Sequence, residues 1–193
     1  MSNLRDIPVF AGELVKTQVA LEYARALHAG QVRGVDGAPF ILHPREVAAL
    51  LHHAGAPDDL VAAGALHDVI EKTPAVAADL RGRFGARVAS LVLAVTEDEQ
   101  IRDYAARKQA LRRQVEAAGE EALMLLAADK VSKARELHLD GGSRAGRRSC
   151  GTRSRRQALT HYAQCLTLLR ARLPASPLVR ELATELEDRS FRR

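Results

Sequence analysis

His67 and Asp68 are adjacent polar residues inside an otherwise apolar run, and both side chains can bind a divalent metal. The residues from 61 to 66, followed by Val69 and Ile70, are apolar or small, so a helix here packs into a core. A buried polar group without a partner costs roughly 2–7 kcal/mol. A metal ion would satisfy both side chains at once. The alternative is a core histidine bonded to a carbonyl beside a surface aspartate.

Two further residues could complete such a site. His43 precedes Pro44, and proline is favoured at the first position of a helix, so His43 is expected at a helix mouth. Asp129 interrupts a mostly apolar helical run, where a carboxylate needs a partner. Asp129 could be a metal ligand, or it could form an ion pair with Lys130 or Lys133.

Together these residues supply two imidazoles and two carboxylates from three separate segments. Mixed nitrogen and oxygen donors of this kind suit manganese, iron, cobalt or zinc without distinguishing among them. With four protein ligands, an octahedral ion keeps positions open for water and substrate. That arrangement is typical of hydrolytic metal sites.

The order His43, His67–Asp68, Asp129 resembles the motif of HD-domain metal phosphohydrolases. The neighbouring residues resemble the hydrolase domain of the RelA/SpoT family, and the length fits its small stand-alone alarmone hydrolases. The similar segments are residues 28–33, 37–44, 66–71, 84–85, 95–97, 107–108 and 128–130. The resemblance covers residues 15–138 and continues more weakly through 177–182.

This resemblance implies a manganese-dependent enzyme whose substrate is (p)ppGpp or a related nucleotide. Water would attack, and pyrophosphate would leave the 3′-oxygen. Glu71 matches the catalytic glutamate of the family and would orient or deprotonate the water. The alternative for Glu71 is a solvent-facing helix residue near Lys72.

Three basic residues are candidate substrate ligands. Arg33 matches a family arginine that packs on the base, and a planar guanidinium suits such stacking. Arg155 matches a basic residue that reaches the phosphates, and Lys108 belongs to a family-like Arg-Lys pair. Each could equally be a surface charge.

The sequence also departs from the family around the expected site. Lys72 stands where an acid usually follows the glutamate, and Lys133 stands where an asparagine is usual. Gly34 replaces a lysine, while Phe40 and Tyr104 replace a tyrosine and a basic residue. We take Lys72 as a candidate catalytic residue and Lys133 as a candidate substrate ligand. Lys72 in place of an acid reverses a charge beside the expected metal, which should disfavour a second cation and favour an additional phosphate or carboxylate.

The composition indicates one helical domain spanning residues 1–193. Of these residues 47% are hydrophobic but only 4% aromatic, so Ala, Leu and Val must build close-packed helices. No apolar run reaches the roughly 18 residues that span a bilayer, so we expect no membrane association. Cys150 and Cys165 form no disulfide framework or metal motif, and we expect free thiols in a reducing cytoplasm.

Hydrophobic periodicity predicts an all-α fold, an HD-type helical bundle in the light of the resemblance. The third helix should be capped by Asp58 or Asp59 and end before Pro74. It would carry His67, Asp68 and Glu71 on one face. The other helices are expected over residues 13–29, 44–54, 75–83, 84–95, 101–118, 120–138, 155–173 and 177–190.

A Gly- and Arg-rich stretch at about 141–154 is expected to be a loop before the terminal helices. Arginines between 144 and 156 contribute +6, so the rest of the chain carries 5 − 6 = −1 of the net charge of +5. The stretch could be a solvated mobile loop or a basic flap over a phosphate-rich ligand. Nucleic acid is an unlikely partner because no aromatic residues are interleaved for base stacking.

Three functions remain open at this point. The leading hypothesis is a nucleotide phosphohydrolase that removes a 3′-pyrophosphate or 3′-phosphate from a small-molecule nucleotide. The second is an HD phosphatase that acts on another phosphoester. The third is a catalytically weak domain that binds a phosphorylated ligand as a sensor, which the lysines at 72 and 133 motivate.

Overall fold

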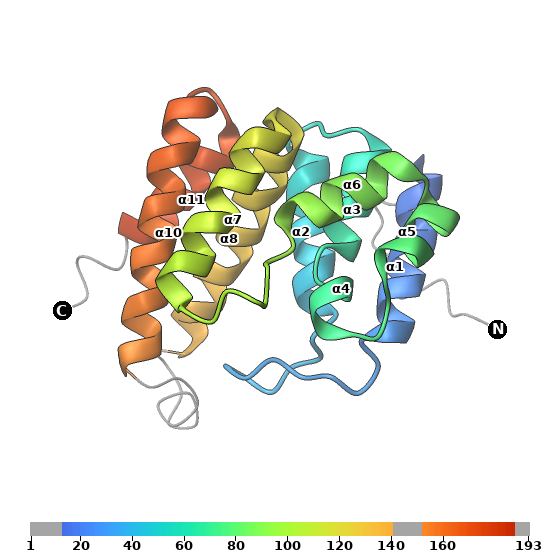
Figure 1. Ribbon diagram of the computed structural model, residues 1–193, viewed down its shortest axis with the longest axis horizontal. Helices are drawn as coiled ribbons and strands as arrows, with labels where there is room; N and C mark the ends of the chain where they lie inside the picture. The colour runs from blue at the N-terminus through green and yellow to red at the C-terminus, as the bar shows by residue number, and fades with distance from the viewer. Residues whose placement is uncertain (1–12, 141–151, 188–193) are drawn as a thin grey trace.

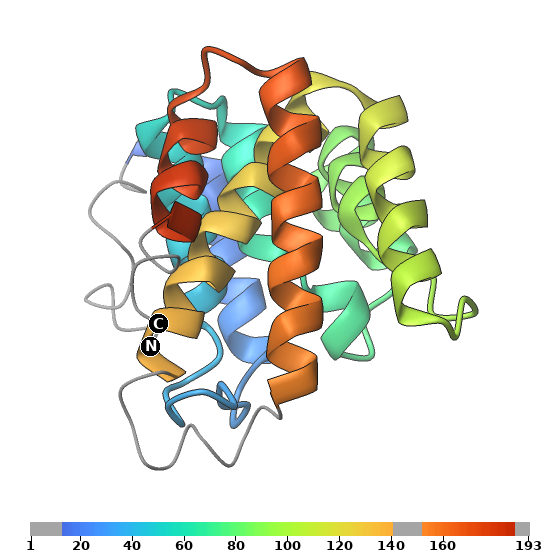
Figure 2. The same ribbon diagram turned by 90° about the vertical axis from the view of Figure 1, so that its left-hand side faces the viewer.

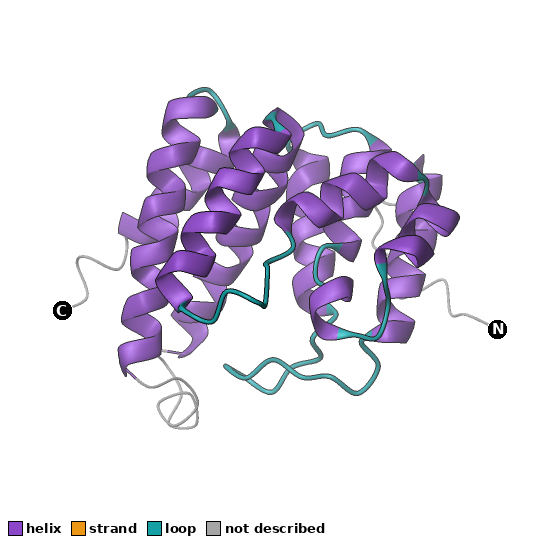
Figure 3. Cartoon of the chain, viewed as in Figure 1, coloured by secondary structure: helices purple, strands orange, loops and turns teal. Residues whose placement is uncertain are grey.

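The computed structural model describes residues 13–140 and 152–187. Figure 3 shows helices joined by loops. Within the described residues, the β-type pairing is limited to one isolated bridge between Val32 and Pro39. The all-α prediction is confirmed. The helices are α1 Val15–Leu27, α2 Leu42–His53, α3 Asp58–Leu66, α4 Val69–Lys72, α5 Ala77–Phe84, α6 Ala86–Val95, α7 Tyr104–Ala118, α8 Glu120–Asp140, α10 Thr152–Arg172 and α11 Pro177–Glu187.

Two helices organise the packing. α3 contacts α1, α2, α6 and α8, and all of its residues from 60 to 66 are buried. α8 contacts α2 and α3 on one side and α7, α10 and α11 on the other (Figures 1 and 2). One cluster of buried apolar side chains runs from α1 to α11. The meeting point of α2, α3 and α8 is therefore the interior of the bundle.

Gly64 lets α2 and α3 approach closely. A Cβ atom on Gly64 would lie 2.6 Å from Leu51 Cδ1 and 3.4 Å from Ala48 Cα. This contact sets the depth at which the end of α3 sits beside the start of α2. It brings His67 next to His43.

The predicted cap of α3 is wrong. Pro57 occupies the cap position of α3, and no side chain caps that helix. The Asp58 carboxylate instead accepts hydrogen bonds from the backbone N–H of Lys16 and of Thr17, both at 2.9 Å. Asp58 thus satisfies the open N–H groups at the start of α1, which lacks a cap of its own.

The third helix is also shorter than predicted. It ends at Leu66, and a new turn, α4, begins at Val69. The Gly64 carbonyl, which a continuous helix would offer to the Asp68 N–H, accepts a hydrogen bond from His67 Nδ1 at 2.8 Å. His67, Asp68 and Glu71 therefore lie around a break between two helices and not along one helix face.

The remaining predicted boundaries agree to within a few residues. α10 begins at Thr152, so residues 152–154 are helical and not part of the predicted basic loop. Residues 141–151 of that loop lie outside the described residues, and the single-domain assignment stays a prediction. No helix in the described ranges is long and apolar enough to cross a membrane.

Candidate metal centre

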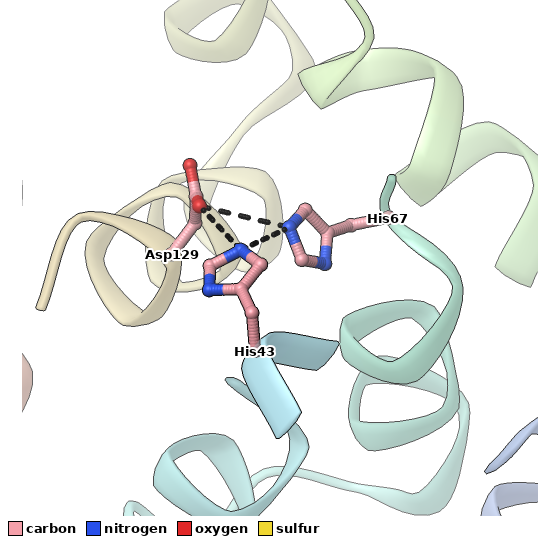
Figure 4. Close-up of side chains that lie close together, drawn as sticks. All are labelled: His43, His67 and Asp129. Atoms are coloured by element: carbon pink, nitrogen blue, oxygen red, sulfur yellow. Dashed lines mark hydrogen bonds and ion pairs between the residues drawn. The ribbon is translucent and has the colours of Figure 1, made fainter. Parts of the chain in front are cut away.

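Four side chains from three segments converge in the middle of the bundle. His43 lies in the first turn of α2, as predicted, and Asp129 lies in α8. His67 and Asp68 occupy the break between α3 and α4. Figure 4 shows His43, His67 and Asp129 pointing toward one another. All four side chains are buried.

The donor atoms of His43, His67 and Asp129 all lie within 4.8 Å of one another, and Asp68 approaches the two histidines from beside this group. His43 Nε2 lies 3.1 Å from His67 Nε2 and 3.3 Å from Asp129 Oδ1. Asp68 Oδ2 lies 3.6 Å from His43 Nε2 and 3.5 Å from His67 Nε2. Ligands about 2.1 Å from a metal lie roughly 3.0–3.4 Å apart at octahedral or tetrahedral angles.

The hydrogen bonds that His43 and His67 make through Nδ1 determine whether each Nε2 atom presents a lone pair to the centre. His67 Nδ1 contacts the Gly64 carbonyl, which can only accept, so Nδ1 carries the proton. His43 Nδ1 lies 2.8 Å from Ser132 Oγ, whose own proton goes to Glu46 Oε2 at 2.7 Å. In the neutral rings both Nε2 atoms therefore present lone pairs to each other. A cation between them would remove that repulsion.

The carboxylates show the same need for a cation. Asp68 Oδ2 is a buried atom without a hydrogen-bond partner, whereas Asp129 Oδ1 is buried with the Lys133 ammonium group 3.0 Å away. Both oxygens point to the two Nε2 atoms. Two nitrogen and two oxygen donors with converging lone pairs fit a divalent transition metal, which could be held by these four residues.

Two lysines of α8 contact the Asp129 carboxylate. Lys130 Nζ lies 2.6 Å from Asp129 Oδ2, and Lys133 Nζ lies 3.0 Å from Asp129 Oδ1. Burial alone raises the pKa of Asp129, but the two ammonium groups outweigh it and hold the pKa well below its usual value. The ion pairs considered for Asp129 are thus present, and they coexist with its place in the cluster.

Glu71 lies one turn beyond this cluster, in α4. Its Oε1 accepts a hydrogen bond from the backbone N–H of Glu97 at 2.7 Å. Burial and then the nearby Asp68 carboxylate raise the pKa of Glu71, although the Glu97 N–H opposes this. With Glu97, Glu99 and Arg107, Glu71 lines a cavity of about 390 Å³. A partly buried carboxylate at a cavity beside a metal site is suited to take a proton from water.

Other predicted residues surround the centre without joining it. Arg33, in the loop before α2, pairs with Asp36 and lies 3.6 Å from Glu136 Oε1. Lys108, in α7, pairs with Glu97 and lies 5.3 Å from the Tyr104 ring centroid.

Lys72 and Arg155 also lie outside the cluster. Lys72 is exposed, and its Nζ lies 5.4 Å from the centre of the Phe40 ring. Arg155 is half-buried near the start of α10.

Several residues of the site were missed from the sequence. Ser132 binds the far side of His43 and donates to Glu46, and Glu97 contacts Glu71, Arg107 and Lys108. Spacing offered one signal, because Ser132 follows Asp129 by three positions and so shares its helix face. Glu46 follows His43 by three positions in α2, and Glu97 lies in a segment that resembles the family, but their contacts with Ser132 and Glu71 reach across to other elements.

The fold and this cluster define a helical protein with two histidines and two aspartates converging at its centre. The chain belongs to the HD-domain family: the model of that family, described as "HD domain", matches residues 20–138. The matched range contains all four converging residues. The resemblance seen in the sequence is thereby confirmed.

Curated relatives are similar over the same region. The chain is 33% identical over 109 residues to a guanosine-3′,5′-bis(diphosphate) 3′-pyrophosphohydrolase of Aquifex aeolicus, covering 56% of this chain and 16% of that protein. It is 37% identical over 90 residues to the bifunctional (p)ppGpp synthase/hydrolase SpoT of Escherichia coli, covering 47% and 13%. The chain thus matches less than a fifth of the length of these relatives.

Two solved structures share the fold. A metazoan ortholog of SpoT, described as hydrolysing ppGpp, superposes with a TM-score of 0.78 at 24% identity, covering 91% of this chain and 96% of that one. A protein of Listeria monocytogenes superposes with a TM-score of 0.66 at 28% identity, covering 75% and 91%. The shared arrangement of helices therefore extends over nearly the whole of that metazoan protein.

Proposed function

We propose that this chain is a divalent-metal phosphohydrolase that removes a 3′-pyrophosphate or 3′-phosphate from (p)ppGpp or a related nucleotide. The observation that carries the proposal is the convergence of the buried donors of His43, His67 and Asp129, with the Asp68 carboxylate beside the two imidazoles. The relatives named as ppGpp hydrolases match this same region of the chain. We assign the four residues as the metal ligands.

We further propose manganese as the metal and the cytoplasm as the compartment. The mixed imidazole and carboxylate donors suit Mn²⁺ among other transition metals. A bound ion would acidify a water molecule and polarise a phosphoryl oxygen. The cytoplasm contains phosphorylated nucleotides and keeps thiols reduced, and Cys165 is a free, buried thiol.

In this proposal Glu71 is the general base. The Glu97 N–H occupies Oε1, which leaves Oε2 to take a proton from the attacking water. Burial raises the pKa of Glu71 toward neutral pH, which favours proton transfer in both directions. The proton can then pass to the leaving 3′-oxygen.

The basic residues around the centre would bind the substrate. Arg33 is held by carboxylates on two sides, which fixes its guanidinium plane for stacking on a base. Lys108, Lys133 and Arg155 would neutralise phosphate groups. Lys72, exposed beside the centre, would contribute positive charge to the catalytic step at a position where the family has an acid.

One observation favours the sensor as a second candidate. Lys133 Nζ lies 3.0 Å from Asp129 Oδ1, the oxygen that faces the other donors. Burial alone lowers the pKa of Lys133, but Asp129 and Asp68 outweigh it and raise the pKa well above its usual value. An ammonium group so placed could hold the carboxylates together without a metal and bind a phosphate directly.

A panel assay with the purified chain separates these functions. The protein would be stripped with a chelator, reloaded with Mn²⁺, and incubated with nucleotides carrying 3′-pyrophosphate, 3′-phosphate or only 5′-phosphates. We expect metal-dependent release of pyrophosphate from ppGpp or its adenosine counterpart. Turnover of other phosphoesters alone would support the general HD phosphatase. Binding without turnover of any substrate would support the sensor.

A further inference from the structure

Ser132 lies between His43 of the centre and the carboxylate of Glu46, which the sequence did not predict as a site residue. The Ser132 side chain is fully buried in α8. Its Oγ lies 2.8 Å from His43 Nδ1 and 2.7 Å from Glu46 Oε2. The three groups form a linear connection from α2 to α8 and back to α2.

The direction of these hydrogen bonds is fixed by the number of available protons. The Glu46 carboxylate has none to donate, so the Ser132 hydroxyl donates to Glu46. The Ser132 oxygen can then only accept, and His43 Nδ1–H donates to it. Glu136 Oε1 lies 3.5 Å from the same nitrogen, beyond a good hydrogen bond for this ring, so Ser132 is the acceptor.

Glu46 is in turn held in place. Arg135 Nη1 donates to Glu46 Oε1 at 2.8 Å, so each Glu46 oxygen has one partner. The same guanidinium pairs with Glu181 and, at 3.0 Å, with Glu185 of α11. The orientation of Glu46 is therefore tied to the last described helix of the chain.

We infer that Ser132 and Glu46 are positioning residues for His43 that set the affinity of the centre for its metal. They hold the proton on Nδ1, fix the rotation of the ring, and polarise it so that Nε2 is a better electron-pair donor. The inference rests on the proposed metal centre. It assigns roles to two residues that contact neither the substrate nor the ion.

The test is the Mn²⁺ affinity of the metal-free chain, measured by isothermal titration calorimetry. Losing an outer partner of a ligating histidine typically weakens metal binding about 10–100-fold. We expect Ser132→Ala to show a loss in that range. Ser132→Thr, which keeps the hydroxyl, should stay within about threefold of the wild-type chain. Glu46→Gln leaves Ser132 intact but weakens its acceptor, so its loss should be smaller, about 3–10-fold.

Thr17→Val is the matched control. Thr17 is a second fully buried hydroxyl that donates to a carboxylate, Asp58 Oδ1, at 2.6 Å, away from the centre. Replacing it should lower the melting temperature of the metal-free chain and leave Mn²⁺ affinity unchanged. Wild-type affinity in Ser132→Ala would overturn the inference, as would an equal loss in Thr17→Val. A wild-type chain that binds no divalent transition metal would instead overturn the proposed function, and the inference with it.

Discussion

The centre of this molecule and its rim are built in different ways. The converging residues lie at the start of α2, at the break after α3 and within α8, and each side chain is buried in the interior of the bundle. The rim residues Arg33 and Lys72 lie on a loop and an exposed turn. By the resemblance to the family, the converging residues match its pattern, whereas Gly34, Phe40, Lys72 and Tyr104 around them depart from it, as does Lys133 beside Asp129. Chemistry that needs fixed lone pairs is held by packed helices, while recognition can change on surfaces that bear little packing.

The largest effect is expected from removing a carboxylate of the centre, which tests whether the buried residues hold a metal. Asp68→Ala should reduce bound metal from one ion per chain to almost none, because two imidazoles and one carboxylate remain to hold it. Elemental analysis after gel filtration measures the metal content. Asp98→Ala, an exposed acid, is the control and should keep its metal. Full occupancy in the Asp68 variant would rule out this ligand set.

The second prediction separates chemistry from metal binding within the centre. Glu71→Gln keeps the oxygen that accepts the Glu97 N–H but removes the proton acceptor. We expect kcat to fall by about 10²–10⁴-fold with metal content unchanged. Glu99→Gln, in the same cavity, should change kcat little. Unchanged turnover in the Glu71 variant would mean that the base lies elsewhere.

The third prediction uses a buried histidine whose surroundings are the reverse of the centre. His161 faces mainly cations: Arg112 Nη1 lies 3.0 Å from its Nδ1, Lys130 and Lys108 are near, and the Asp129 carboxylate opposes them only weakly. Burial, followed by these charges, lowers the pKa of His161 to about 2. The folded chain therefore resists protonation of this ring, while the unfolded chain accepts a proton near pH 6.5.

Stability from His161 is thus complete above about pH 6.5 and is lost as the pH falls. At pH 5 the loss should reach about 2 kcal/mol relative to pH 8. His161→Gln keeps an acceptor for Arg112 and should lack this part of the pH dependence. Urea unfolding of the metal-free chain at pH 5 and pH 8 measures it. Identical pH profiles for the two proteins would contradict a buried neutral His161.

The smallest expected effect concerns the rim. Restoring the family pattern with Lys72→Asp and Lys133→Asn changes the charge around the centre by −2 − 1 = −3 and should raise kcat/KM for ppGpp about tenfold, a change of about 1.4 kcal/mol. Activity on a more anionic native substrate should fall at the same time. Arg113→Asn, which removes an exposed cation of α7, controls for the loss of a positive charge away from the centre. A double variant with normal metal content and no gain on any 3′-pyrophosphorylated nucleotide would count against the alarmone substrate.

Residue types and periodicity were enough to predict the helical class and the grouping of His43, His67, Asp68 and Asp129. Each of these residues stands out locally, as a polar group in an apolar run or beside a helix-starting proline. Their role as ligands stays a prediction. The cap that Asp58 provides and the Glu46–Ser132 contact could not be predicted, because they join residues 41 and 86 positions apart. The break at His67 could not be predicted for a related reason. There the His67 side chain bonds the Gly64 carbonyl, and no local sequence pattern indicates that contact.

The bond between Asp58 and the start of α1 has a consequence for the order of folding. α1 is made before α3, and the carboxylate that caps α1 is synthesised 41 residues after Thr17. A helix of 13 residues is marginal in isolation, so α1 gains a stable N-terminus only once α3 has docked against it. We therefore expect α1 and α3 to become ordered together during folding, and not one after the other.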